Sequence, residues 1–193
     1  MDEVLIEARK RFLALRTYRA DLRVQAGDGV QLLHYAYRRP GWVRMELVQP
    51  HHGVVLVFDP LERRVRLWPF GLAHGPSLSL SPDHRLVRGP RGHRIDRSDV
   101  GALFDNLIAL GARGSVGTVE EGGEDAQASR VLEVIGDAGA AVAGVHRYRL
   151  RLATDSLFPQ RVQSFATSGR PIETVDFEAV ELDVELPDHL FRA

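Results

Sequence analysis

The chain has 193 residues, of which 44% are hydrophobic and 26% charged, so it fits one globular domain with a sizeable hydrophobic core. Its formal net charge of −1 gives no reason to expect binding to nucleic acid or to an anionic membrane surface. The absence of cysteine excludes disulfides, thiolate nucleophiles and cysteine-based zinc sites.

An amphipathic helix is predicted at residues 2–17, where apolar residues recur at three- and four-residue steps. They are Val4, Leu5, Ala8, Phe12 and Leu15. No apolar window approaches the roughly 20 residues that a transmembrane helix needs, so no transmembrane segment is expected. The first residues lack the basic and apolar regions of a secretory signal, and we expect any such signal to lie outside this sequence.

The periodicity changes to two after residue 17, which predicts a strand from about Tyr18 to Gln25. Further strands are predicted at about 30–38, 42–49, 53–58 and 63–68. The turns between them are short, and short turns require antiparallel neighbours. Residues 30–37 and 54–58 are apolar on both alternating faces, as the consecutive Val55 and Leu56 illustrate. Something is therefore expected to cover the second face of these strands.

Residues 70–97 are rich in glycine, proline, serine, histidine and arginine, which predicts a long loop or lid segment. A second helix is expected to start after Ser98, which suits an N-cap, and to end near Gly111. Strands follow at about 115–121, 129–136, 145–154, 160–168 and 172–184. The chain is thus predicted to form a single domain, 1–193, of the α+β class, with two helices serving one large antiparallel sheet.

The segment from His93 to Ser98 is the most varied chemically, since it brings histidine, Asp96 and serine close together. Their order and spacing match no nucleophile elbow, so we favour local pairing of Arg94, Asp96 and Arg97, with a gating role for the loop as the functional alternative. The eight histidines show no metal-ligand spacing, and no phosphate-binding glycine motif is present. We expect no metal, no cofactor and no enzymatic activity.

The predicted sheet is too broad for two helices to cover, which leaves an apolar concavity for a lipid-like ligand. The residues that suggest it are Trp42, Val43, Met45, Leu47, Val55, Val57 and Leu67. An ordinary hydrophobic core is the alternative explanation of the same residues.

Several passages together resemble LolA-like periplasmic lipoprotein carriers. Residues 37–50 are similar to the family's aromatic-x-(Lys/Arg)-Arg-Pro … Gln-Pro region, and an apolar strand and Asp59 follow as they do there. Residues 155–161, 169–177 and 186–191 are similar to the closing strands and to a terminal leucine-proline … phenylalanine pattern. The turn at 59–62 replaces the family's Asp-Gly-Lys, and residues 76–99 have no counterpart, so a divergent relative is expected.

The resemblance implies an incomplete, half-open β-barrel whose concave face is covered by helices and whose apolar cavity takes acyl chains. Its wall would consist of Trp42, Val43, Met45, Leu47, Val55 and Val57 from the strands and Leu103, Phe104 and Leu107 from the second helix. Arg39 matches the family arginine that is thought to hold the lid closed.

A periplasmic carrier or binding protein for lipoproteins or lipids is the function that the resemblance implies. Its partners would be lipoprotein acyl chains or another lipid, together with inner- and outer-membrane proteins, and it would act as a monomer in the cell envelope. The alternative is a lipid-sensing regulatory module of the bacterial envelope that binds a protein partner. An enzyme would rest only on the loop around His93.

Overall fold

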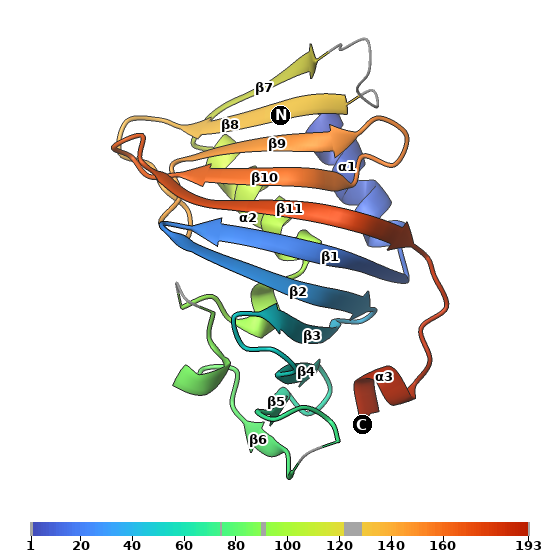
Figure 1. The fold of residues 1–193 in the computed structure, drawn as a ribbon. Coiled ribbons are helices and arrows are strands. Elements are labelled where there is room, and N and C mark those ends of the chain that lie inside the picture. Colours follow the sequence, from blue (N-terminus) through green and yellow to red (C-terminus); the bar gives the residue numbers. More distant parts are fainter. Residues whose placement is uncertain (1, 74, 90–91, 122–128, 193) are drawn as a thin grey trace. The chain divides into compact units, whose positions relative to one another are not determined.

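The computed structural model describes residues 2–73, 75–89, 92–121 and 129–192. Its strands form one sheet in the order β6-β5-β4-β3-β2-β1-β11-β10-β9-β8-β7, with β6 and β7 as its two edges (Figure 1). The sheet is therefore open, and the predicted α+β class with a large antiparallel sheet and helices is confirmed. Among the described residues, no helix has both the length and the apolar character that crossing a membrane requires.

The elements follow the predicted order closely. The strands are β1 (Thr17–Ala26), β2 (Gly29–Arg38), β3 (Trp42–Gln49), β4 (Val55–Asp59), β5 (Arg64–Trp68), β6 (Leu78–Leu80), β7 (Gly114–Glu121), β8 (Ser129–Gly136), β9 (Arg147–Ala153), β10 (Pro159–Phe165) and β11 (Pro171–Leu182). The helices are α1 (Glu3–Ala14), α2 (Val100–Gly111) and α3 (His189–Arg192), with 3-10 turns η1 (Arg85–Val87) and η2 (Ile95–Arg97).

Three local predictions need correction. The first helix ends at Ala14 rather than at residue 17, because the backbone N–H of Arg16 donates to the Asp183 carboxylate and β1 begins at once. The predicted loop 70–97 contains β6, η1 and η2; its residues 74, 90 and 91 lie outside the described part. Helix α3 was not predicted, since four residues are too short to show a period.

The chain divides into two compact units. The first contains Met1–Ala14, Val24–Gly29 and Val100–Phe177, and in it α2 packs on α1 and on strands β7 and β8. The core of this unit is formed by large side chains that are almost wholly buried. They include Phe104, Leu107, Leu110, Leu132, Val134, Leu150 and Leu152.

The second unit contains Leu15–Arg23, Val30–Asp99 and Glu178–Ala193, that is, strands β2 to β6, parts of β1 and β11, the connection from β6 to α2, and α3. All four residues from Val55 to Phe58 on β4 are buried, so the predicted cover on both faces of this strand is confirmed. On β2 only Leu33 and residues 35–37 are buried and His34 is exposed, so the same prediction fails for part of that strand. The prediction of one domain over 1–193 stays a prediction.

Candidate functional site

The two faces of strands β3 and β4 in the second unit carry different sets of side chains. Successive residues of a strand point to opposite faces, so Trp42 shares one face with Val55 and Val57. The antiparallel register pairs Val43 with Phe58 and places these two on the other face. We call the first the α3 face and the second the opposite face.

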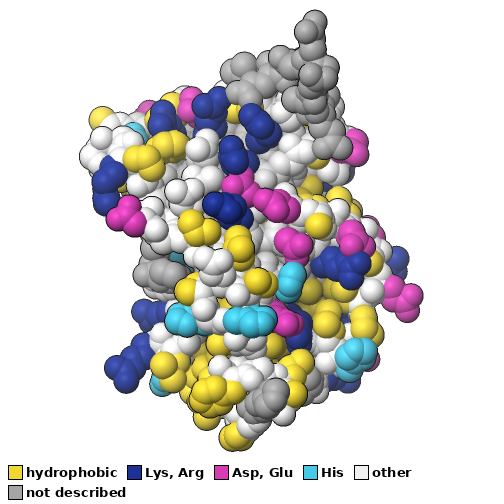
Figure 2. Space-filling model, viewed as in Figure 1, with side chains coloured by type: hydrophobic (Ala, Val, Ile, Leu, Met, Phe, Trp, Pro, Cys, Tyr) yellow, Lys and Arg dark blue, Asp and Glu magenta, His cyan; other side chains and the backbone are white. Residues whose placement is uncertain are grey.

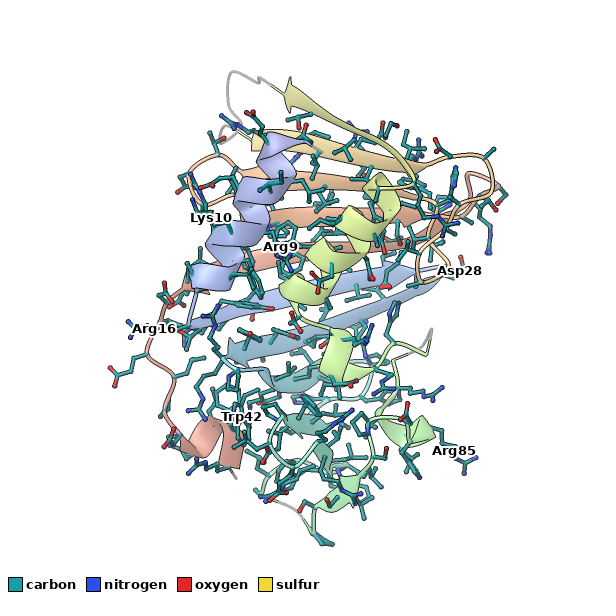
Figure 3. The ribbon with its side chains drawn as sticks, turned by 180° about the vertical axis from the view of Figure 1, so that it is seen from behind. Arg9, Lys10, Arg16, Asp28, Trp42 and Arg85 are labelled. Atoms are coloured by element: carbon teal, nitrogen blue, oxygen red, sulfur yellow. The ribbon has the colours of Figure 1, made fainter. Side chains whose placement is uncertain are left out.

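The α3 face carries an apolar cluster to which α3 contributes a side chain. Figure 3 shows one member of it, Trp42, on the side of the strands where α3 lies. The buried members of the cluster are Ala36, Trp42, Val55, Val57, Trp68 and Phe191. The Phe191 side chain of α3 is 2% exposed, and its ring packs on Trp42 with centroids 6.1 Å apart in an edge-on arrangement. Leu186 and Leu190 pack against the same cluster and are half-buried. A single ring and two leucines thus cover the centre of this face.

Two arginines fasten the C-terminal segment to the strands. The guanidinium of Arg38 lies 4.6 Å from the centre of the Phe191 ring and 2.6 Å from a carboxylate oxygen of Asp188. Arg44, which is 8% exposed, donates to the carbonyl oxygen of Leu190 at 3.1 Å. The cover is therefore held by cation–π, ionic and hydrogen-bonding contacts near the molecular surface, together with the buried ring.

A pocket of about 600 Å³ adjoins this cluster in the second unit. Its walls are formed by Arg16, Thr17, Arg38, Arg39, Pro40, Asp183, Val184, Glu185 and Leu186. Arg38 and Leu186 belong both to the pocket wall and to the surroundings of the apolar cluster. The site therefore has a charged end, with three arginines and two carboxylates, and an apolar end beneath α3.

Local hydrogen bonds set the shape of the pocket. The Thr17 hydroxyl donates to the carbonyl of Val184 at 2.6 Å, and the backbone N–H of Arg39 donates to the carbonyl of Arg16 at 2.9 Å. These bonds join the start of β1 to the segment after β11 and to the turn between β2 and β3. That turn contains the Arg39–Pro40 peptide bond, which is cis.

Arg39, the predicted latch, is exposed and lines the pocket. Burial raises the pKa of the neighbouring Tyr37, and Asp99 raises it further, while the Arg39 guanidinium opposes the rise by its charge and a hydrogen bond to the hydroxyl. Arg39 is thus placed at the mouth of a pocket. Its role as a latch stays a prediction.

The opposite face of the second unit is built around stacked tyrosines. The ring of Tyr18 stacks on Tyr35 and Tyr37, with centroids 5.7 and 5.1 Å apart. The Tyr35 hydroxyl lies 3.2 Å from the Ser98 hydroxyl, so the end of the 70–97 connection docks against this face. Burial raises the pKa of Tyr35, and the charge of Asp99 adds to the shift.

The structure brings only part of the predicted cavity wall together. Trp42, Val55 and Val57 meet on the α3 face, whereas Val43, Met45 and Leu47 belong to the opposite face. Leu103, Phe104 and Leu107 lie on α2 in the first unit; Phe104 and Leu107 are buried in its core, and Leu103 is half-buried. A cavity shared by all nine residues stays a prediction.

The residues that suggested a hydrolase are paired locally. Arg94 grips both carboxylate oxygens of Asp96, at 2.9 and 2.7 Å, and this lowers the pKa of Asp96. Arg94 also reaches Asp83 at 2.6 Å, and the Ser98 hydroxyl donates to the carbonyl of Ile95 at 2.7 Å. The predicted pairing of Arg94 with Asp96 is confirmed. Within the ranges that the structure describes, no three histidine or acidic side chains gather as metal ligands.

Sequence reasoning missed the residues that hold the cover in place. Arg38, Arg44 and Trp68 were not singled out, and Phe191 entered only through the terminal pattern of the family resemblance. Their contacts join positions about 150 residues apart, such as Arg38 with Asp188. The sequence signals for these contacts were Arg38, which precedes Arg39, and the apolar residues Leu190 and Phe191.

Comparisons with solved structures support the fold. The chain aligns with an uncharacterized conserved protein from Thermus thermophilus at 10% identity and a TM-score of 0.61, covering 99% of this chain and 91% of that one. It aligns with Pseudomonas aeruginosa MucB, from a complex with MucA, at 14% identity and a TM-score of 0.55; the alignment covers 97% of this chain and spans 61% of MucB. These two likenesses show a shared fold.

A LolA superfamily protein from Nitrosomonas europaea is also among the similar structures, at 14% identity and a TM-score of 0.44, covering 97% of this chain and 95% of that one. No family model and no curated protein sequence matches the chain.

Proposed function

We propose that the protein binds an amphiphile, a lipid or the acyl chains of a lipoprotein, and carries it in the cell envelope. The observation that supports this most directly is the continuity between the pocket at Arg39 and the apolar cluster under α3. A volume of about 600 Å³ lies within the range of small-molecule sites, which is roughly 300–1,000 Å³. The arginine-rich end suits a polar or anionic head group, and the apolar end suits a hydrocarbon chain.

Phe191 occupies the place that a chain would take, so binding requires the C-terminal segment to leave. Burial of Phe191 and of the half-buried Leu186 and Leu190 stabilises the docked segment, and the conformational entropy lost when the segment becomes ordered opposes docking. Because these contributions offset one another, we expect the cover to open at a cost of about 1–2 kcal/mol. Each buried methylene of an acyl chain contributes about 0.8 kcal/mol, which is enough to displace it.

The test measures binding of a fluorescent fatty acid to the full chain and to two variants. Phe191→Ala is expected to bind the probe about tenfold more tightly, because the fraction of molecules with an open site limits the apparent affinity. His189→Ala, a change on the exposed side of the same helix, is the matched control and should leave binding unchanged. Native mass spectrometry of the mildly purified protein should also show a bound lipid. Failure of both the wild type and Phe191→Ala to bind the probe would contradict the proposal.

A regulatory binding module is the second candidate, and the fold shared with MucB favours it. That structure contains MucB in a complex with MucA, so one protein with a similar fold binds a protein partner. Here lipid occupancy would control a protein contact rather than transport. The two functions differ in one measurement, transfer of the labelled fatty acid from the protein to acceptor vesicles, which only a carrier performs efficiently.

A further inference from the structure

One end of the second unit exposes large apolar side chains to solvent. Figure 2 shows hydrophobic side chains gathered over the region where β5 and β6 lie. The residues that we call the tip patch are Val48, Phe70, Leu72 and Leu78, which are 37%, 75%, 45% and 42% exposed. A phenylalanine that is three-quarters exposed beside other apolar side chains is characteristic of a contact surface.

The topology brings the members of the tip patch to the same end of the strands. Phe70 and Leu72 follow the last residue of β5, and Leu78 starts β6, where it pairs with Leu67. The turn after β3 lies beside them, since a Cβ at Gly71 would lie 3.2 Å from the carbonyl oxygen of Gly53. The patch is therefore formed by neighbouring turns.

The same part of the chain is strongly basic. Residues 61–98 contain eight arginines and only three acidic residues, a net charge of +5 in a chain whose total is −1. Asp83 and Asp96, two of these three acids, are already bound by Arg94. Arg85 of η1 extends away from the ribbon (Figure 3). Exposed apolar side chains thus occur within a segment of positive charge.

We propose that the tip patch docks on an anionic lipid bilayer, with Phe70 and Leu72 entering the interface and the exposed Arg85 and Arg88 facing the lipid phosphates. Apolar insertion combined with basic charge is the combination that holds proteins at such surfaces. An aromatic and aliphatic tip offers little to a nucleic acid, whose contacts are polar and ionic. Docking does not depend on the proposed lipid-carrying function, because it places the protein on the bilayer without extracting a lipid.

The test is cosedimentation of the full chain with vesicles of phosphatidylcholine alone or with about 30% phosphatidylglycerol. Binding is expected only to the anionic vesicles, and about 0.5 M salt should weaken it by screening. Phe70→Ser combined with Leu72→Ser should weaken it at least about tenfold. The matched control is Leu61→Ser, which alters a side chain that is 73% exposed before β5, at the other end of that strand. It should bind as the wild type does.

Equal loss with Leu61→Ser, or binding to neutral vesicles that salt leaves unchanged, would overturn the proposal. So would binding of the wild type to soluble polyglutamate as tight as to anionic vesicles, which would indicate an acidic protein as the partner. Fluorescent fatty acid binding by the Phe70 and Leu72 variant should stay normal, so a failure of docking can be told apart from a failure of lipid binding.

Discussion

The two units cover their strands in different ways. In the first, the twelve-residue helix α2 places four buried residues, Val100, Phe104, Leu107 and Leu110, in its core and packs on β7 and β8. In the second, the four-residue helix α3 buries the Phe191 side chain alone. Its other attachments to the strands are contacts with Arg38 and Arg44.

The energies of the two covers differ accordingly. Four buried side chains anchor α2 in its core, whereas α3 contributes one buried ring and contacts near the surface, each of which adds little. The longer helix thus buries more side chains than the shorter one. We therefore expect the cover of the second unit to open more readily than the packing of α2 in the first.

The largest effect is expected from Gly114→Ala on β7, which tests whether the first unit is fixed. A methyl group there would overlap the carbonyl oxygen of Ile135 and approach the Cα of Gly136 at 2.7 Å, so strand pairing must shift. We expect a loss of about 3 kcal/mol in the free energy of unfolding, measured by urea denaturation. Gly117→Ala, on the same strand with nothing within 4 Å, should cost less than about 1 kcal/mol. Equal losses of stability in the two variants would show that the strands of the first unit shift readily to accommodate the added methyl group.

A smaller effect is expected from Phe191→Ala, which tests whether the cover of the second unit is loose. Undocking limits the loss of global stability to about 1–2 kcal/mol, below the roughly 3–5 kcal/mol of an ordinary buried phenylalanine. Hydrogen exchange should speed up in residues 186–192 and stay unchanged in α2. A loss of about 4 kcal/mol, or faster exchange throughout the second unit, would show that α3 is part of a fixed core.

The smallest effect concerns Tyr35 on the opposite face of the second unit. Its pKa in the folded protein is raised above the ordinary value of about 10, so its stabilising contribution is present below pH 10 and is lost as the pH rises through the folded pKa. At pH 8, Tyr35→Phe should cost about 1 kcal/mol by losing the hydroxyl contact with Ser98. Near pH 11 this difference should shrink or reverse, as measured by urea unfolding. Ser98→Ala, which removes the contact but no titrating group, should retain the alkaline loss of the wild type.

The sequence predicted the sheet well because its signals are local. The alternation in Tyr148, Leu150 and Leu152 and the short turns identified β9 and its neighbours to within a few residues. The same locality limited the candidate site. Trp42 and Val43 looked alike as apolar strand residues, yet they belong to opposite faces, and the family resemblance could not show which one α3 covers.

Charge illustrates the same limit. The total of −1 gave no reason to expect an anionic surface as a partner, because the acidic remainder of the chain cancels the arginines of residues 61–98. The exposure of Phe70 and Leu72 at one end of β5 and β6 appears only in the folded protein, where these strands are paired. A net charge carries no information on where the charges lie.

By itself, the sequence determined the class of the fold, the order and approximate bounds of its strands and two longer helices, and the position of Arg39 in a turn. Periodicity and turn chemistry depend on neighbouring residues, so the chain displays them directly. Only the tertiary structure decided that Phe191 fills the apolar cluster, that Arg38 fastens it, and that a pocket opens beside Arg39. These contacts join residues about 150 positions apart, and they form because exposed apolar strand faces must be covered by whatever segment the fold brings to them.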